Sequence, residues 1–358
     1  MEKNTFFTPG PAALYPHLEE YLQQAMDLQL GSISHRSAQF KKVYQHTDEQ
    51  LRALLGIPAE HAIMFTGTAS EIWERIILNL SSLETFHLVN GSFSKKFYEY
   101  AVDLGRHAHK QEKPMKEGFQ YAEVEVPAYA EVICTTQNET STGVQMREPD
   151  IHKLKRSHAG KLLAVDMVSS APIADLDYGV VDTAFFSVQK SFGLPAGLGV
   201  WIANEACLAK SEELASQGSI GAHHRLPELW KQSKAYQTPS TPNVLGIYML
   251  GKVAEDMNKT GIDTLRKVTE QKAKRLYDYF EAKPGYGLAV KEAALRSKTV
   301  CVVEVEQPAA EVISALKSKG LVIGAGYGPF KETQLRIANF IATSPEKIED
   351  LLSAFDNL

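Results

Sequence analysis

Two residues that could do chemistry together stand just past the ends of neighbouring apolar runs. Asp166 follows the run Leu162–Val165, and Lys190 comes shortly after the run Thr183–Val188. Ligands of open α/β sheets bind outside the carboxyl ends of the strands, so both side chains are expected to face one crevice. A carboxylate and an amine there fit pyridoxal phosphate, because the amine can form a Schiff base with the cofactor aldehyde while the carboxylate keeps the pyridine nitrogen protonated.

The residues around Lys190 bear on the alternative, in which Asp166 caps a helix and Lys190 is a solvated loop lysine. Gln189 precedes the lysine, and the loop Ser191–Gly199 follows it with the sequence SFGLPAGLG. Glycines in such a loop let the backbone approach a ligand closely. This context favours the cofactor interpretation.

A second candidate segment, Phe65–Glu71, leads from an apolar run into a helical pattern. Thr68 and Glu71 have the spacing of a capping box, which places the free N–H groups of the helix start near Ala69 and Ser70. Helix N-termini bind anions, and the anion expected here is the 5′-phosphate of the cofactor. Capping alone is the alternative, but the position at the same crevice favours phosphate binding.

The elements that must position these residues form a regular series. From residue 61 onward, short apolar runs alternate with helical patterns such as Glu71–Leu80, which is typical of βαβ units and a largely parallel sheet. The runs are nearly solid, as strands buried on both faces should be. The predicted strands are Ala62–Phe65, Phe86–Val89, Val132–Thr135, Leu162–Val165, Thr183–Val188 and Gly199–Ile202.

The C-terminal third has a different pattern. A long helical stretch, Val244–Phe280, precedes an alternation of strands and helices that predicts a compact α+β unit. We therefore expect a large cofactor-binding domain, residues 15–255, and a small domain of residues 256–358 completed by the N-terminal segment 1–14. The predicted elements of the small domain are the strands Val300–Val305 and Leu335–Phe340 and the helices Ala309–Lys319 and Pro345–Phe355.

The composition restricts the function classes. The 358 residues carry a formal charge of −5, with a pI near 6.1, which argues against general binding to nucleic acids or membrane surfaces. Cys134, Cys207 and Cys301 lack metal-ligand spacing, and their odd number suits a reducing cytoplasm. No signal peptide or membrane span is expected. These features predict a cytoplasmic protein without a bound metal.

Several short motifs occur in order along essentially the whole chain. They are TPGP at Thr8–Pro11, SHRS at Ser34–Ser37, QNET at Gln137–Thr140, VDxxSS at Val165–Ser170, SxQK at Ser187–Lys190 and LRI at Leu335–Ile337. Together they resemble the class V aminotransferases of fold type I. The resemblance implies an α/β fold with a large, mainly parallel-sheet cofactor domain, a small α+β C-terminal domain and pyridoxal 5′-phosphate as cofactor.

Within class V, the motifs are most similar to those of the phosphoserine aminotransferases. That similarity implies pyridoxal-phosphate-dependent transamination between phosphoserine and 2-oxoglutarate in serine biosynthesis. It also implies a homodimer with the active site at the subunit interface. The expected ligands are small amino acids and 2-oxo acids, with no nucleic acid or membrane as partner.

The resemblance also assigns roles to individual residues. Lys190 is the Schiff-base lysine and the base that moves a proton, and Asp166 is the partner of the pyridine nitrogen. Phe93, in the segment Asn90–Phe93, falls where an aromatic side chain stacks on the cofactor ring, although an ordinary core phenylalanine is the alternative. The other expected cofactor contacts are Thr68, Ala69, Ser70 and Gln189 at the phosphate, Thr140 near the phenolic oxygen, and Gln237 and Thr238 at the phosphate of the partner subunit's cofactor.

Three residues are expected at the substrate. Arg336 lies in a predicted strand between apolar residues, where a guanidinium needs a partner and is well shaped to hold a carboxylate. A structural salt bridge is the alternative. The resemblance makes Arg336 the binder of the substrate α-carboxylate, and places His35 and Arg36 at the second anionic group of the substrate.

The sequence departs from the phosphoserine aminotransferases at two places. Ser70 stands where an arginine is common, and the segment Gly324–Lys331 lacks the usual His-Arg pair before Arg336. This segment is more similar to the alanine–glyoxylate or serine–pyruvate branch of class V, which is the alternative function. A phosphorylated substrate needs compensating cations, and the candidates are His35, Arg36, Lys331 and the cluster His223, His224 and Arg225.

Two other classes are less favoured by the residues. A desulfurase or lyase of this family would need a mobile catalytic cysteine, and none of the three cysteines lies in an evident active-site loop. A catalytically silent scaffold of the same fold would not need to retain both Lys190 and Asp166.

Overall fold

The larger sheet of the protein has seven strands in the order β2-β10-β9-β8-β5-β3-β4. The pairs β9–β8, β8–β5, β5–β3 and β3–β4 are parallel, whereas β10 is antiparallel to both β9 and β2. The computed structural model describes residues 4–218, 220–221 and 223–358. The strands are β2 (Ala62–Thr66), β3 (Glu84–Val89), β4 (His107–Glu112), β5 (Val132–Thr136), β8 (Leu162–Asp166), β9 (Thr183–Ser187) and β10 (Gly199–Ala203).

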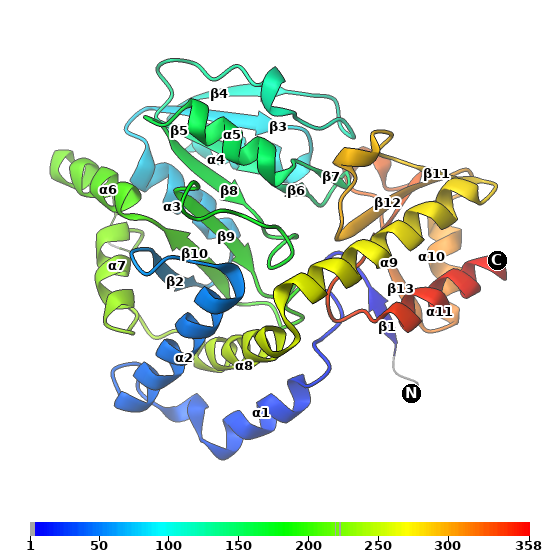
Figure 1. Ribbon diagram of the computed structural model, residues 1–358, viewed down its shortest axis with the longest axis horizontal. Coiled ribbons are helices and arrows are strands. Elements are labelled where there is room, and N and C mark those ends of the chain that lie inside the picture. Colours follow the sequence, from blue (N-terminus) through cyan, green and yellow to red (C-terminus); the bar gives the residue numbers. More distant parts are fainter. Residues whose placement is uncertain (1–3, 219, 222) are drawn as a thin grey trace.

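Helices cover both faces of this sheet (Figure 1). Along β10, Val200 and Ile202 belong to the core on one face, while Trp201 belongs to the core on the other. The first core includes side chains of α2 and α8, and the second includes side chains of α3 and α4. Burial on both faces explains why the strands are nearly solid apolar runs. These helices are α2 (Ala38–Leu55), α3 (Ser70–Leu80), α4 (Ser92–Asp103) and α8 (Val244–Thr260).

A second sheet of five strands lies beside the first, in the order β1-β13-β14-β12-β11 (Figure 1). The N-terminal strand β1 pairs in parallel with β13, so the N-terminal segment belongs to the same sheet as the C-terminal strands β11 to β14. Apolar side chains of α9, α10 and α11 form its core, and α9 leads to it from α8. The elements are β1 (Thr5–Phe7), β11 (Tyr286–Leu288), β12 (Val300–Val305), β13 (Leu321–Ala325), β14 (Gln334–Ala338), α9 (Ile262–Ala282), α10 (Ala309–Ser318) and α11 (Pro345–Asp356).

The remaining elements surround the large sheet or connect its strands. A two-residue ladder joins β6 (Asn138–Glu139) to β7 (Val144–Gln145). No helix in the described ranges combines the length and apolar character that a membrane span requires. The other helices are α1 (Leu18–Asp27), α5 (Glu148–Ser157), α6 (Glu205–Gln217) and α7 (Leu226–Lys234), with short 3-10 turns at Leu30–Ser32, Tyr121–Glu123, Ala293–Leu295 and Gly328–Phe330.

The α/β class and the mainly parallel large sheet agree with the expectation from the sequence. Each of the six predicted strands of that sheet is present within two residues of its expected ends, and β4 is an additional strand at the edge. The predicted helical stretch 244–280 is two helices, α8 and α9, separated at Gly261. The domain boundary at residue 255 stays a prediction, and residues 1–3 of the predicted N-terminal segment lie outside the described residues.

Candidate active site

Asp166 and Lys190 lie at the carboxyl ends of adjacent strands. Asp166 is the last residue of β8, and Lys190 follows the end of the parallel strand β9 by three positions. Each is close enough to shift the titration of the other, since Lys190 lowers the pKa of Asp166 and Asp166 raises that of Lys190. The structure therefore brings the carboxylate and the amine together at one edge of the sheet.

The carboxylate of Asp166 is 3% exposed and is held on both oxygens. The indole N–H of Trp73 donates to Oδ2 at 3.0 Å, and the backbone N–H of Val168 donates to Oδ1 at 2.9 Å. Burial nevertheless raises the pKa of Asp166 to about 7, and the nearby Glu139 adds to the rise. A buried carboxylate of this kind is stabilised by a cationic N–H partner, which the pyridine nitrogen of pyridoxal phosphate would supply when protonated.

The amine of Lys190 is directed at the N-terminal segment. Its Nζ donates to the carbonyl oxygen of Pro9, and a Cβ at Gly10 would overlap the amine. Gly10 also has a φ of +136°, which side-chain-bearing residues rarely adopt. Burial lowers the pKa of Lys190 to about 8, and the positive charge of Arg336 lowers it further. The lowered pKa makes the neutral amine, the form that acts as a nucleophile or base, far more populated near neutral pH than in an ordinary lysine.

The predicted capping box at the start of α3 is present. The Thr68 backbone N–H donates to Oε1 of Glu71 at 2.9 Å, and the Glu71 N–H donates to the Thr68 hydroxyl at 3.3 Å. Ala69 and Ser70 stand between them at the helix start. Gln189 accepts from the hydroxyl of Ser187 at 2.5 Å, just before Lys190. These backbone and side-chain groups fit the phosphate site expected from the sequence.

Phe93 is held in place by a buried carboxylate. Glu139 is fully buried and accepts from the backbone N–H groups of Phe93 and Ser94, at 3.1 and 2.8 Å, in the first turn of α4. The Phe93 ring is partly exposed, and its centroid lies 5.3 Å from that of Tyr327. Phe93 is therefore a partly exposed aromatic residue whose backbone is held in place, which suits the predicted stacking on the cofactor ring.

Arg336, on β14, is largely buried and reaches the same region. Its Nε donates to the carbonyl of Ala325 at 2.8 Å, and its Nη1 donates to the carbonyl of Thr140 at 3.4 Å. The Tyr327 ring lies 5.2 Å from its guanidinium carbon. Within the described ranges no carboxylate forms an ion pair with Arg336, so the expected alternative of a structural salt bridge is not found. The charge is free to hold a substrate carboxylate.

The remaining expected site residues form a separate group. Arg36 donates to the side-chain oxygen of Gln237 at 3.0 Å and to the carbonyl of Pro239 at 3.3 Å. His35 lies 3.4 Å from the hydroxyl of Thr241, and Thr238 is buried in the same segment. In the part of the chain that the structure describes, no hydrogen bond or ion pair joins this group to Lys190 or Arg336. A single chain therefore holds two groups of predicted site residues.

Three residues of the site were not expected from the sequence. Trp73 lies in the helical pattern Glu71–Leu80, Glu139 in the motif QNET and Tyr327 in the segment Gly324–Lys331, and the sequence assigns none of them a role. Of the three, only Trp73 could have been suspected from the sequence, because the indole N–H of a buried tryptophan usually donates to an acceptor. The cysteines offer no nucleophile, since Cys134, Cys207 and Cys301 are buried and burial raises the pKa of each thiol.

The fold and the site together define a class of protein. A mainly parallel sheet, with a lysine and an aspartate at the carboxyl ends of neighbouring strands and a second small sheet, is the architecture of the fold type I aminotransferases. The family model described as aminotransferase class-V matches residues 105–332. The chain belongs to this family and is an aminotransferase.

Several similar proteins have been described. A phosphoserine aminotransferase from Cytophaga hutchinsonii is 44% identical, and its structure covers all of this chain and 99% of its own, with a TM-score of 0.97. The phosphoserine aminotransferase of Corynebacterium glutamicum (strain R) is 29% identical over 98% of this chain and 93% of its own. The structure of an alanine–glyoxylate aminotransferase from Nostoc sp. is 20% identical with a TM-score of 0.84, covering all of this chain and 95% of its own, and this similarity concerns the fold alone.

Proposed function

We propose that this chain binds pyridoxal 5′-phosphate and transfers the amino group of phosphoserine to 2-oxoglutarate. The observation that carries the proposal is the end-to-end similarity, at 44% identity, to the phosphoserine aminotransferase of Cytophaga hutchinsonii. The buried pair of Asp166 and Lys190 supports the choice of cofactor, since its charges and burial fit a pyridine nitrogen and an aldehyde. A cytoplasmic location stays a prediction.

The residues of the chain would divide the work as follows. When bound, the cofactor supplies an aldehyde that accepts an amino group and a ring that accepts electrons. Lys190 would be the residue that binds the aldehyde group, and its neutral amine would serve as the base that moves a proton at the substrate Cα. Asp166 would keep the pyridine nitrogen protonated, and Trp73 and the Val168 N–H orient that carboxylate. Ala69, Ser70 and Gln189 hold the phosphate.

Arg336 would bind the α-carboxylate that phosphoserine and 2-oxoglutarate share. The second anionic group of either substrate then requires another cation, farther from the cofactor than Arg336. Lys96 on α4 is such a cation, since its Nζ lies 3.2 Å from the hydroxyl of Tyr327, whose ring faces Arg336. This lysine offers one substitute for the His-Arg pair that the segment before Arg336 lacks. Lys331 is exposed, and no hydrogen bond or ion pair ties its side chain to the site within the described ranges.

A second copy of the chain would complete the site. Large apolar side chains near the N-terminus are exposed, including Leu14, Leu22, Met26 and Leu28 at 44–58%. Clustered exposed apolar residues are typical of protein interfaces. In a homodimer the group of Arg36, Gln237 and Thr238 would be contributed to the partner's site, which accounts for its separation from Lys190 within one chain.

An amino-donor screen tests the proposed substrate. We expect the holoenzyme to convert phosphoserine with 2-oxoglutarate, with a kcat/KM at least about 100-fold above that for serine or alanine. The reason is that a buried phosphate contact from Arg or Lys contributes about 1.5–3 kcal/mol and more than one is available. The measurement is glutamate formation at equal concentrations of phosphoserine, serine and alanine.

Mixing the holoenzyme with one amino donor at a time, without acceptor, provides the control, because the cofactor spectrum then reports the first half-reaction alone. If serine and alanine change the spectrum while phosphoserine and glutamate do not, the phosphoserine proposal is wrong. The chain would then be an alanine–glyoxylate or serine–pyruvate type enzyme, as the segment 324–331 suggested.

A further inference from the structure

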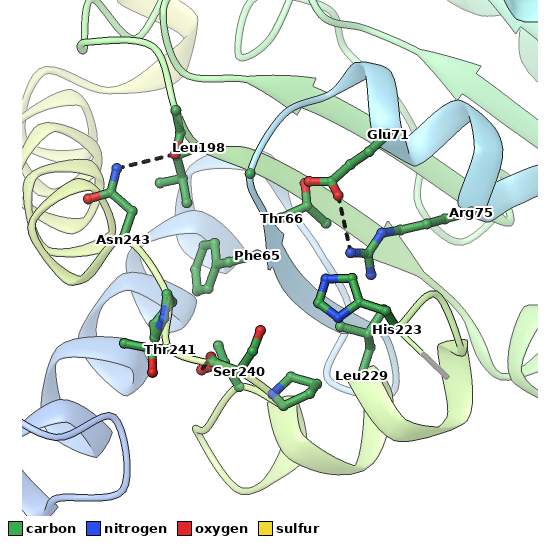
Figure 2. A pocket seen from close by; sticks show the side chains of 15 residues that line it. Phe65, Thr66, Glu71, Arg75, Leu198, His223, Leu229, Ser240, Thr241 and Asn243 are labelled. Carbon is green, nitrogen blue, oxygen red and sulfur yellow. Dashed lines mark hydrogen bonds and ion pairs between the residues drawn. The ribbon is translucent and has the colours of Figure 1, made fainter. Parts of the chain in front are cut away.

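A cavity lies beside the start of α3, along the face of this helix that carries Glu71 and Arg75. Its volume is about 280 Å³, and its walls are the start of α3, the loop around Leu198, His223 and the segment 238–243. Glu71 and Arg75 are four residues apart on α3 and line it together (Figure 2). Trp73, which donates to Asp166, lies two residues from each and so points to the other side of the helix. The cavity thus lies on the opposite face of α3 from Asp166, and Thr238, one of the expected cofactor contacts, is among its lining residues.

Arg75 is an unusual residue for this position. It is 3% exposed, and among the described residues its one ion pair joins Nη2 to Glu71 at 3.2 Å. Its Nε and Nη1 are buried without a hydrogen-bond partner among the described residues. Leaving a charged donor buried and unpaired is costly, so an acceptor is expected at these two atoms.

The rest of the cavity supports a negatively charged acceptor. The carboxylate of Glu71 is already occupied by the Thr68 N–H and by Arg75, which lower its pKa. His223 adds a ring N–H donor, and Figure 2 shows its ring on the same side of the cavity as the Arg75 guanidinium. The hydroxyl groups of Ser240 and Thr241 line the opposite wall. The volume exceeds that of one water many times over and suits a small ligand.

We propose that this cavity is a binding site for a small oxyanion, a phosphate or the phosphoryl group of a small metabolite, held by Arg75 with His223 and the hydroxyls of segment 238–243. The same segment contacts His35 and Arg36, so an anion bound here would stabilise the loop that carries Gln237 and Thr238. The inference does not depend on which amino donor the enzyme uses.

Calorimetric titration of the holoenzyme with inorganic phosphate tests the site, because the bound cofactor already fills its own phosphate site. We expect saturable binding in the wild type. Binding should be at least about tenfold weaker in Arg75→Gln, because this variant loses charge-assisted hydrogen bonds to the anion. Arg75→Lys retains the charge and should bind within a few fold of the wild type. Arg275→Gln is the matched control, since Arg275 is an exposed helical arginine paired with Glu349 at 2.8 Å, and it should bind like the wild type.

Titration with glycerol phosphate separates the two sources of the oxyanion. Tighter binding than that of inorganic phosphate identifies a phosphorylated metabolite, and equal or weaker binding identifies the free anion. Crystals of the wild-type holoenzyme soaked in selenate provide a measurement that needs no variant. The proposal expects an anomalous peak within hydrogen-bonding distance of Arg75.

Three results would overturn the proposal. The first is phosphate binding that Arg75→Gln leaves unchanged and Arg36→Gln abolishes, which would place the anion at the substrate site. The second is phosphate binding by the cofactor-free protein and none by the holoenzyme, which would identify the cofactor's own phosphate site. The third is a selenate peak elsewhere and none at Arg75, which would leave water as the occupant of the cavity.

Discussion

Replacing Lys190 by alanine is expected to lower kcat by at least about 10⁴-fold, the upper end of what a positioned general base contributes. Burial and the positive charge of Arg336 lower the pKa of this amine to about 8. The amine can therefore act as nucleophile and base near neutral pH. The variant should fold, because the side chain makes one hydrogen bond, to the carbonyl of Pro9. Turnover and the visible absorbance of the purified protein are the measurements.

Lys272→Ala is the comparison that separates a catalytic lysine from a buried structural one. Burial also lowers the pKa of Lys272 to about 8, but its Nζ donates to the carbonyls of Phe340 and Thr343 at 3.0 and 2.6 Å, away from the cofactor residues. We expect this variant to lose stability and to keep the absorbance of the bound cofactor. Retained absorbance in Lys190→Ala, together with retained turnover, would contradict the role of Lys190.

Replacing Asp166 by asparagine is expected to reduce kcat by about 10²–10³-fold, the effect of removing one preorganised electrostatic contact in a buried site. Asparagine has nearly the same shape and can still accept from Trp73 or Val168, but it cannot keep a pyridine nitrogen protonated. The measurement is the steady-state rate with saturating amino donor. Wild-type turnover in this variant would exclude the electrostatic role.

The same substitution should stabilise the cofactor-free protein. Burial raises the pKa of Asp166 from 3.8 to about 7, so the folded state binds a proton more tightly than the unfolded state does. The wild type therefore loses stability as the pH rises through this range, by at most about 4 kcal/mol above pH 7. The unfolding free energy of Asp166→Asn should exceed that of the wild type at pH 8, with a smaller difference at pH 5. An equal difference at both pH values would contradict the raised pKa.

The sequence predicted those features that depend on local pattern. Strands such as Leu162–Asp166 are apolar throughout because both faces of the large sheet are buried, and the reading of Asp166 as a strand-end carboxylate followed from that run. The capping box at Thr68 and Glu71 is likewise a matter of residues three positions apart. Both features follow from the spacing of residues that are close together in the sequence.

The features that were missed depend on contacts between distant segments. β4 forms the edge of the large sheet and consists of exposed and half-buried residues, mostly polar, so it has no apolar run to mark it. Trp73 and Asp166 are 93 residues apart, and Pro9 and Lys190 are 181 apart. No local pattern reports such pairs. The orphaned donors of Arg75 could not be foreseen either, because they depend on how α3 is buried in the folded protein.

Lys190, as the residue that carries the cofactor, is central to the whole site. Reduction of the wild-type holoenzyme with sodium borohydride makes the lysine–cofactor bond permanent, and mass spectrometry of the digested protein then identifies the modified residue. We predict that the pyridoxyl group is found on the peptide containing Lys190. Its presence on Lys272 or another lysine, with an unmodified Lys190 peptide, would contradict the assignment of the whole site.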